Sequence, residues 1–149
     1  FYRDIDWPII IMLAAMIPIG TALQTTGLSD VISSNISILA TDMSLFWILF
    51  LILIITMATT DIINNAATAV IMAPISAGIG IELGYAIEPF LMVVAVGASC
   101  AFLTPIGHQC NTVVMGPGNY KFTDYWRLGL PLDILIIAVS IPMILFVWT

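Results

Sequence analysis

The sequence predicts an all-α integral membrane protein, and two observations support this fold class: the scarcity of charge and the succession of long apolar stretches. Of the 149 residues, 61% are hydrophobic and 8% are charged, and the mean hydropathy is +1.14. Soluble domains carry about 25% charged residues, so this chain has too few charges to cover a water-exposed surface. We therefore expect the lipid bilayer to be its main partner.

The charge balance and the cysteines argue against other classes of protein. The net charge is −6, from nine acidic and three basic residues, so no basic stripe exists to meet the phosphates of a nucleic acid. Cys100 and Cys110 form neither a CxxC pair nor a zinc spacing, and we interpret them as small packing residues. The sequence shows no set of nucleophile, base and orienting group, so we expect no enzyme activity.

The outer segments predict two spanning helices and one interfacial arm. Residues 7–28 are apolar and long enough to cross the hydrocarbon core. Residues 29–42 mix isoleucine and leucine with serine, asparagine and aspartate, which predicts a helix lying at the membrane interface. Residues 130–148 predict the final spanning helix. Because the chain begins at Phe1 without a recognisable signal sequence, we expect residues 1–149 to be one membrane domain cut from a longer protein.

Residues 43–81 predict a re-entrant helical hairpin. Two apolar runs meet at Asn64-Asn65 with almost no turn residues between them, and the second run, from Ala66 to Ile81, is short for a span. A hairpin that enters and leaves the membrane on one side explains both features. Its polar tip would be tolerated only where it is buried in protein or lines a wet cavity.

Residues 89–117 predict a helix that is broken between Thr104 and Asn111. Pro105 removes a backbone donor and Gly107 permits unusual dihedral angles. A proline kink with local hydrogen-bond repair is the simpler explanation. Six of the eight residues from 104 to 111 are polar or helix-breaking, which is more than a kink requires, so we predict a functional break.

The positions of the charged residues predict the orientation of the chain in a multi-pass cell-membrane protein. With a re-entrant hairpin, the three basic residues fall on one face of the membrane, and the acids of the other connections fall on the opposite face. The positive-inside rule then assigns the basic residues to the cytoplasmic side; these are Arg3, Lys121 and Arg127. A hairpin that crossed the membrane twice would give the same parity, so charge does not distinguish the two paths.

The hairpin tip gathers groups that are suited to binding ions. Hard cations such as Na⁺ take oxygen ligands, and the N–H groups at a helix N-terminus attract anions. Asn64 and Asn65 supply amides and Thr60 a hydroxyl. The alternative is that these side chains only cap helices and hold them together. Asp61 is ionisable and close to the tip, so it is a candidate coupling residue, although it could equally serve as a cap. His108 in the second break has no second histidine, so no metal other than sodium is predicted.

The same motifs resemble a known family, the divalent anion:sodium symporters. Asn64-Asn65-Ala66-Ala67-Thr68, followed by Ile71-Met72-Ala73-Pro74-Ile75, resembles the Ser-Asn-Thr hairpin signature of that family. Residues 98–105 and 111–116 resemble its second broken helix. Residues 104–111, together with 116–118 and 127–131, are similar to permeases of the family that often carry cytosolic regulatory domains. The resemblance covers nearly the whole chain, as the second of two inverted repeats.

This resemblance implies sodium-coupled symport by an elevator-type movement, with the site lying between two hairpin tips and two broken helices. By position, Asn64 stands where the signature has Ser, Asn65 matches its Asn, and Ala66 replaces its Thr. His108 stands where many dicarboxylate carriers have Thr, before Gln109-Cys110 in place of an expected Pro-Pro. These departures weaken a dicarboxylate assignment and suit a small oxyanion such as sulfate at least as well.

The sequence therefore predicts the C-terminal repeat of a secondary transporter of a small divalent anion, sulfate or a di- or tricarboxylate, with Na⁺ as the coupling ion. We expect the missing N-terminal repeat and a second copy, in a homodimer, as partners. The predicted substrate-binding residues are Asn64, Asn65, Thr68, Thr104, His108 and Asn111; the sodium-binding residues are Thr60, Asn65, Gly107 and Asn111; the possible coupling residues are Asp61 and His108.

Three alternatives remain open from the sequence. A Na⁺/H⁺ antiporter of the same architecture would use Asp61 or His108 as the proton carrier. An arsenite-type exporter would share the hairpin and the broken helix. A non-transporting membrane subunit would tolerate replacement of the tip asparagines.

Overall fold

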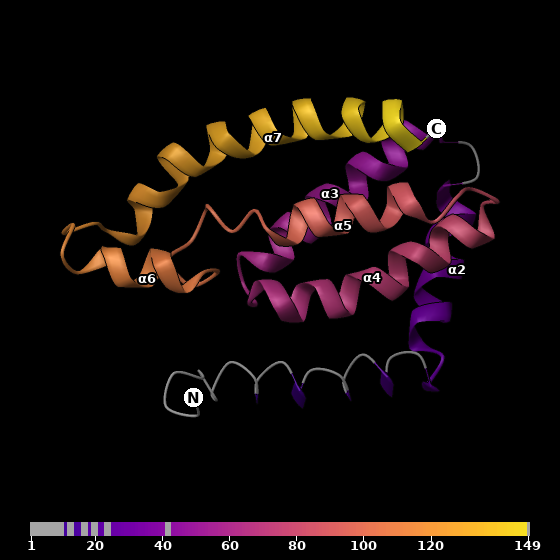
Figure 1. Ribbon diagram of the computed structural model, residues 1–149, viewed down its shortest axis with the longest axis horizontal. Helices are drawn as coiled ribbons and strands as arrows, with labels where there is room; N and C mark the ends of the chain where they lie inside the picture. Colours follow the sequence, from indigo (N-terminus) through magenta and orange to yellow (C-terminus); the bar gives the residue numbers. More distant parts are fainter. Residues whose placement is uncertain are drawn as a thin grey trace, which may run out of the picture.

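The computed structural model describes residues 25–40 and 43–148, with isolated positions between 11 and 22, and the described part is built of helices joined by turns (Figure 1). The predicted first spanning segment, residues 7–28, lies mostly outside the described residues, as does Arg3. The helices are α2 (Leu28–Ala40), α3 (Leu45–Thr60), α4 (Asn65–Glu82), α5 (Glu88–Ala98), α6 (Gln109–Met115), the short 3₁₀ helix η1 (Phe122–Asp124) and α7 (Tyr125–Trp148). The all-α prediction is confirmed for this part of the chain.

Helices α3 and α4 form the predicted hairpin, and residues 61–64 form its tip. Helix α4 has 18 residues, and the continuous stretch Phe122–Trp148 has 27; by length and composition both could cross a membrane. The second arm is therefore two residues longer than the apolar run 66–81 that the sequence shows. The arm is longer because Asn64 caps it, accepting a hydrogen bond from the Ala67 backbone N–H at 2.8 Å, and because it continues past Pro74 to Glu82. The re-entrant path itself stays a prediction.

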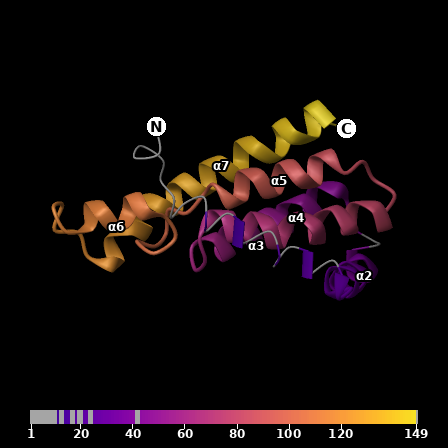
Figure 2. The ribbon, with the colours of Figure 1, turned by 60° about the horizontal axis from the view of Figure 1, so that its bottom comes forward.

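Helix α5 packs against both arms of the hairpin, so its C-terminus arrives at the hairpin tip (Figure 1). Small residues on the helices allow the close approach. A Cβ on Gly97 of α5 would lie 2.9 Å from the Cβ of Thr56 in α3, and a Cβ on Gly80 of α4 would lie 2.9 Å from the Phe90 ring of α5. Helix α2 crosses α4 at Gly78 and runs transverse to the hairpin, so that Figure 2 shows it end-on.

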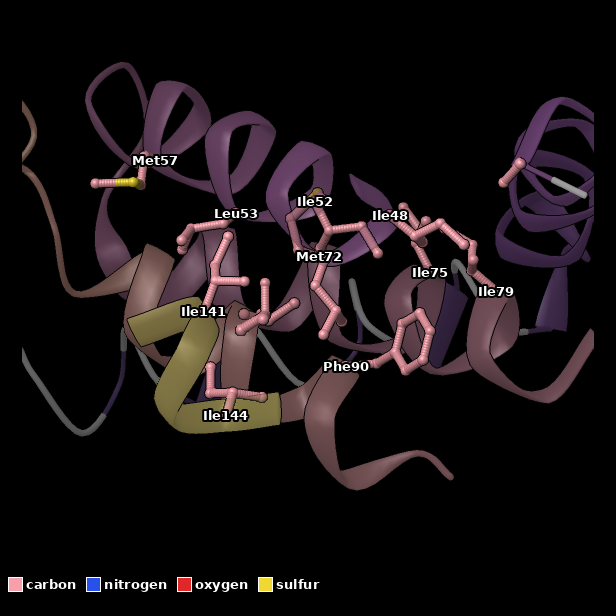
Figure 3. Packing of buried hydrophobic residues seen from close by; sticks show 14 of the residues in the cluster. Ile48, Ile52, Leu53, Met57, Met72, Ile75, Ile79, Phe90, Ile141 and Ile144 are labelled. Carbon is pink, nitrogen blue, oxygen red and sulfur yellow. The ribbon is translucent and has the colours of Figure 1, made fainter. Parts of the chain in front are cut away.

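The apolar core lies between α3, α4, α5 and α7 (Figure 3). Its buried members include Ile48, Ile52, Leu53, Met57, Met72, Ile75, Ile79, Phe90, Ile141 and Ile144. Large apolar side chains also cover the outside, and Phe146 and Leu128 are 86% and 78% exposed. Extensive exposed apolar surface marks contact with lipid or with further protein, as expected for a domain that sits in a membrane.

The helix break is present but begins earlier in the chain than the sequence predicted. Helix α5 ends at Ala98, before Thr104, and α6 already begins at Gln109. The Ser99 hydroxyl donates to the Ala95 carbonyl at 2.8 Å, and the Cys100 thiol donates to the Val96 carbonyl at 3.1 Å. Such side-chain bonds compete with helix continuation. The break therefore covers residues 99–108, and Asn111 belongs to the helix that follows it.

Helix α7 returns along α5 after the turn at residues 116–121 (Figure 1). It approaches the break closely, because a Cβ on Gly129 would lie only 2.5 Å from the Phe102 carbonyl oxygen. A side chain larger than hydrogen would push the helix away at this point. The break is thus enclosed between the hairpin tip on one side and α7 on the other.

Candidate functional site

The Thr60 hydroxyl joins three helix ends at the hairpin tip. Thr60 is fully buried at the end of α3, and its Oγ1 lies 2.8 Å from Asn65 Oδ1 and 3.0 Å from the Ala98 carbonyl oxygen. These two acceptors share the single hydroxyl proton. Asn65 is the first residue of α4 and Ala98 is the last of α5. The positive end of α4 therefore lies beside the negative ends of α3 and α5.

Asp61 joins the tip to the break through its side chain and its backbone. Its Oδ1 accepts a hydrogen bond from the Leu103 backbone N–H at 3.0 Å, and its carbonyl oxygen accepts one from the Thr104 hydroxyl at 2.6 Å. Gly107 packs directly on this region, because a Cβ there would lie 2.8 Å from the Thr60 carbonyl oxygen. The two polar interruptions that are about 40 residues apart in the sequence therefore lie in contact.

Asn111 holds the shape of the break from the first turns of α6. Its Nδ2 donates to the carbonyl oxygens of Ala101, at 2.8 Å, and Thr104, at 3.0 Å. Its own carbonyl accepts a hydrogen bond from the Tyr125 hydroxyl of α7 at 2.7 Å. Sequence reasoning missed Tyr125, because an aromatic residue next to Trp126 and Arg127 is typical of a membrane interface and indicates no contact inside the fold.

His108 caps α6 and presents one free ring nitrogen. Its Nδ1 accepts a hydrogen bond from the Cys110 backbone N–H at 3.2 Å. In a neutral imidazole one nitrogen accepts and the other donates, so the proton sits on Nε2. His108 is exposed, and its Nε2–H is left available to a ligand.

One cavity of about 400 Å³ is lined by residues of both the hairpin tip and the break. Pockets of roughly 300–1,000 Å³ hold small molecules in proteins. The residues that line the cavity are Asn65, Ser99, Ala101, Phe102, His108 and Asn111. Among the described residues, the Oδ1 of Asn65 and the Nδ2 of Asn111 are engaged within the fold, which leaves the Asn65 Nδ2 as a donor and the Asn111 Oδ1 as an acceptor. The cavity wall therefore offers both N–H donors and an oxygen ligand.

Three further residues of the predicted substrate site do not line this cavity. Asn64 is exposed, and its side chain is used as the cap of α4. Thr68 is fully buried, and its hydroxyl has no hydrogen-bond partner among the described residues. The Thr104 hydroxyl also accepts from the backbone N–H groups of Ile106 and Gly107, at 3.3 and 3.1 Å, so it shapes the loop.

Asp133 of α7 is a second residue that the sequence analysis did not select. It is 7% exposed and lies within electrostatic range of Asp61. The available signal was an ionisable residue inside an apolar helix, which is a functional candidate by default.

These helices and this cavity define the class: a helical domain in which a hairpin and a broken helix meet at a polar centre, an arrangement that is typical of membrane transporters. A family model described as citrate transporter matches residues 1–97. The chain therefore belongs to the citrate transporter family.

Similar curated proteins are also transporters. The chain is 38% identical over 143 residues to Uncharacterized transporter YfbS of Escherichia coli strain K12, and the alignment covers 96% of this chain and 23% of that protein. It is 28% identical over 139 residues to Sodium/sulfate cotransporter 2 of Chlamydomonas reinhardtii, covering 93% of this chain and 16% of that protein. It is 25% identical over 146 residues to the sodium-dependent dicarboxylate transporter SdcS of Staphylococcus saprophyticus, covering 97% of this chain and 28% of that protein. The chain thus spans less than a third of the length of each.

Proposed function

We propose that this chain supplies one half of the site of a sodium-coupled symporter for a small divalent anion. The observation that carries the proposal is the single cavity lined by Asn65 of the hairpin and by His108 and Asn111 of the broken helix. The names of two relatives, a sodium/sulfate cotransporter and a sodium-dependent dicarboxylate transporter, support the same class of substrate and coupling ion.

The anion would be held by N–H groups. The Asn65 amide and the His108 Nε2–H both belong to residues of the cavity wall, and Asn65 opens the 18-residue helix α4. Helix N-termini attract anionic groups through their free N–H donors and dipole. Ala66, next to Asn65, offers no hydroxyl, so a compact oxyanion such as sulfate suits this site at least as well as a longer dicarboxylate.

The sodium ion would be held by oxygens on the tip side. The candidates are Thr60 Oγ1, Asn65 Oδ1, Asn111 Oδ1 and the Gly107 carbonyl. Broken helices expose backbone carbonyls and helix C-termini that coordinate Na⁺ in transporters, and α3 and α5 both end beside Thr60. A sodium ion here would neutralise part of the charge of the anion next to it and so favour joint binding.

An elevator-type movement fits the way in which the tip and the break are joined. The bonds from Thr60 to Ala98, from Leu103 to Asp61 and from Thr104 to Asp61 tie the hairpin to the broken helix. These bonds favour movement of the two as one body. In this proposal the N-terminal repeat supplies the opposite wall, a second copy completes a homodimer, and the exposed Lys121 and Arg127 face the cytoplasm.

The proposal is tested with the full-length protein in proteoliposomes under an inward Na⁺ gradient. Radiolabelled sulfate, succinate and citrate are offered separately, and we expect sulfate to be taken up at least as well as the carboxylates. Asn65→Ala and Asn111→Ala should abolish uptake while leaving membrane insertion intact. Asn35→Ala, which removes an exposed amide from α2, is the matched control.

Two results would redirect the assignment. Normal uptake in both variants would contradict the proposed site and favour a structural role for the asparagines. Proton release on addition of Na⁺, without dependence on any anion, would support an antiporter instead.

A further inference from the structure

We propose that Asp61 and Asp133 together form a second sodium site, placed between the break and α7 and separate from the cavity at Asn65. The observation behind it is a pair of buried carboxylates that approach the break from opposite sides and each keep one oxygen without a partner. The sodium identity rests on the proposed sodium-coupled function, whereas the pair itself rests on the geometry.

Asp61 presents the first free oxygen. The residue is 4% exposed, and its Oδ1 is engaged by the Leu103 N–H. Its Oδ2 is buried and has no hydrogen-bond partner among the described residues. The backbone N–H at Oδ1 is compatible with an ionised carboxylate, but burial makes the ionised form costly unless a counter-charge reaches the other oxygen.

Asp133 presents the second free oxygen from α7. The residue is 7% exposed, and its Oδ1 is buried without a hydrogen-bond partner in the described part of the chain. It lies one helical turn after Gly129, on the face of α7 that touches the Phe102 carbonyl. The Asp61 and Asp133 carboxylates are within electrostatic range of each other, and the Cys100 thiol is within range of both.

The described chain offers no basic side chain to neutralise the pair. Its lysine and its arginine, Lys121 and Arg127, are both exposed. Arg127 precedes Asp133 by six residues, which places the two on different faces of the helix. Asp133 is also the only charged residue of α7 after Arg127. Ionisable residues inside membranes pair with one another or with backbone carbonyls, and they mark the paths of ions and substrates.

Sodium suits this arrangement because it takes hard oxygen ligands. The ion would draw on Asp61 Oδ2, on Asp133 Oδ1 and on the Phe102 carbonyl oxygen, which packs against Gly129 one turn away. An ion held in this way would link α7 to the unit formed by the hairpin and the broken helix. The arrangement predicts more than one sodium ion bound per chain.

The test is equilibrium binding of ²²Na⁺ to the purified full-length protein in detergent, without any anion. Asp133→Asn keeps the shape of the side chain and should lose one bound sodium ion per chain relative to wild type. Asp61→Asn should lose the same ion, and the double variant should lose no more than either single variant. Asp30→Asn, an exposed acid on α2, is the matched control and should bind as many ions as wild type.

The outcomes separate this site from the proposed transport. An unchanged number of bound sodium ions in Asp133→Asn would overturn the site. A double variant that loses two sodium ions would overturn it as well, because each acid would then hold an ion of its own. If Asp61→Asn fails to fold, Asp133→Asn alone decides, since its unpartnered oxygen anchors no hydrogen bond in the described chain. Absence of sodium-driven anion uptake in wild type would refute the proposed function without changing this binding result.

Discussion

Substitution of Gly107 by alanine tests how tightly the break is seated on the hairpin tip. An added Cβ would lie 2.8 Å from the Thr60 carbonyl oxygen, 2.9 Å from the Ala101 Cβ and 3.1 Å from the Asp61 Cα. Ordinary contacts of a Cβ fall between 3.4 and 4 Å, and two of these three neighbours are backbone atoms. The break must therefore move away from the tip.

The free energy of this change can be worked out from two opposing effects. Overpacking costs about 1–3 kcal/mol, and the loss of glycine freedom in the unfolded chain returns about 0.4–1 kcal/mol. We expect Gly107→Ala to destabilise the protein by about 1–2 kcal/mol. Gly116→Ala is the matched control, because nothing lies within 4 Å of its added Cβ, and it should be neutral or slightly stabilising.

Thermal unfolding of the full-length protein in detergent measures the difference between these variants, and sodium-driven uptake measures its functional consequence. Gly107→Ala should unfold at a lower temperature than Gly116→Ala and should lose most of its uptake, because a site that is displaced by fractions of an ångström binds poorly. Equal unfolding temperatures together with full uptake would refute the packing of the break on the tip.

Two hydrogen bonds of the site give further predictions. Thr60→Val keeps the shape of the side chain but leaves the buried Ala98 carbonyl without its hydroxyl donor, so it should lower the free energy of unfolding by about 1–3 kcal/mol. Thr59→Val, at a half-buried site, is the control and should lower it less. Equal losses of stability in thermal unfolding would argue against a special role for Thr60. Tyr125→Phe removes the hydrogen bond to the Asn111 carbonyl. It should destabilise the protein by about 0.5–1.5 kcal/mol and raise the KM of anion uptake. An unchanged KM would show that α7 does not position α6.

The sequence was sufficient to locate the hairpin and the break, because both interrupt long apolar runs with polar or helix-breaking residues. Such residues occur at membrane depth only where they are buried in protein or line a wet cavity. Asn64-Asn65 between two apolar stretches indicated the tip, and α4 begins at Asn65. Pro105 and Gly107 indicated the break. Its start was missed, because Ser99 and Cys100 look like ordinary small residues of an apolar helix, and their bonds to the preceding turn become visible only in the folded structure.

Contacts between distant segments could not be predicted from local patterns. Asp61 meets Leu103, and the Tyr125 hydroxyl meets the Asn111 carbonyl, only once the chain has folded. Asp133 is one acid in an apolar helix, and its proximity to Asp61 depends on how α7 packs over the break. The sequence therefore identified the side chains that carry polar chemistry, whereas the fold decides which of them line the cavity and which hold its walls.

The central claim, that the hairpin and the broken helix form one anion site, is tested most directly by a double-mutant cycle between Asn65 and His108. Sulfate affinity of the full-length protein is measured at fixed Na⁺ for Asn65→Ser, His108→Gln and the double variant. Residues that share one ligand show a coupling energy of about 0.5–3 kcal/mol, and we predict a value in this range. Additivity within about 0.3–0.5 kcal/mol would show that the two residues act independently and would contradict a single site.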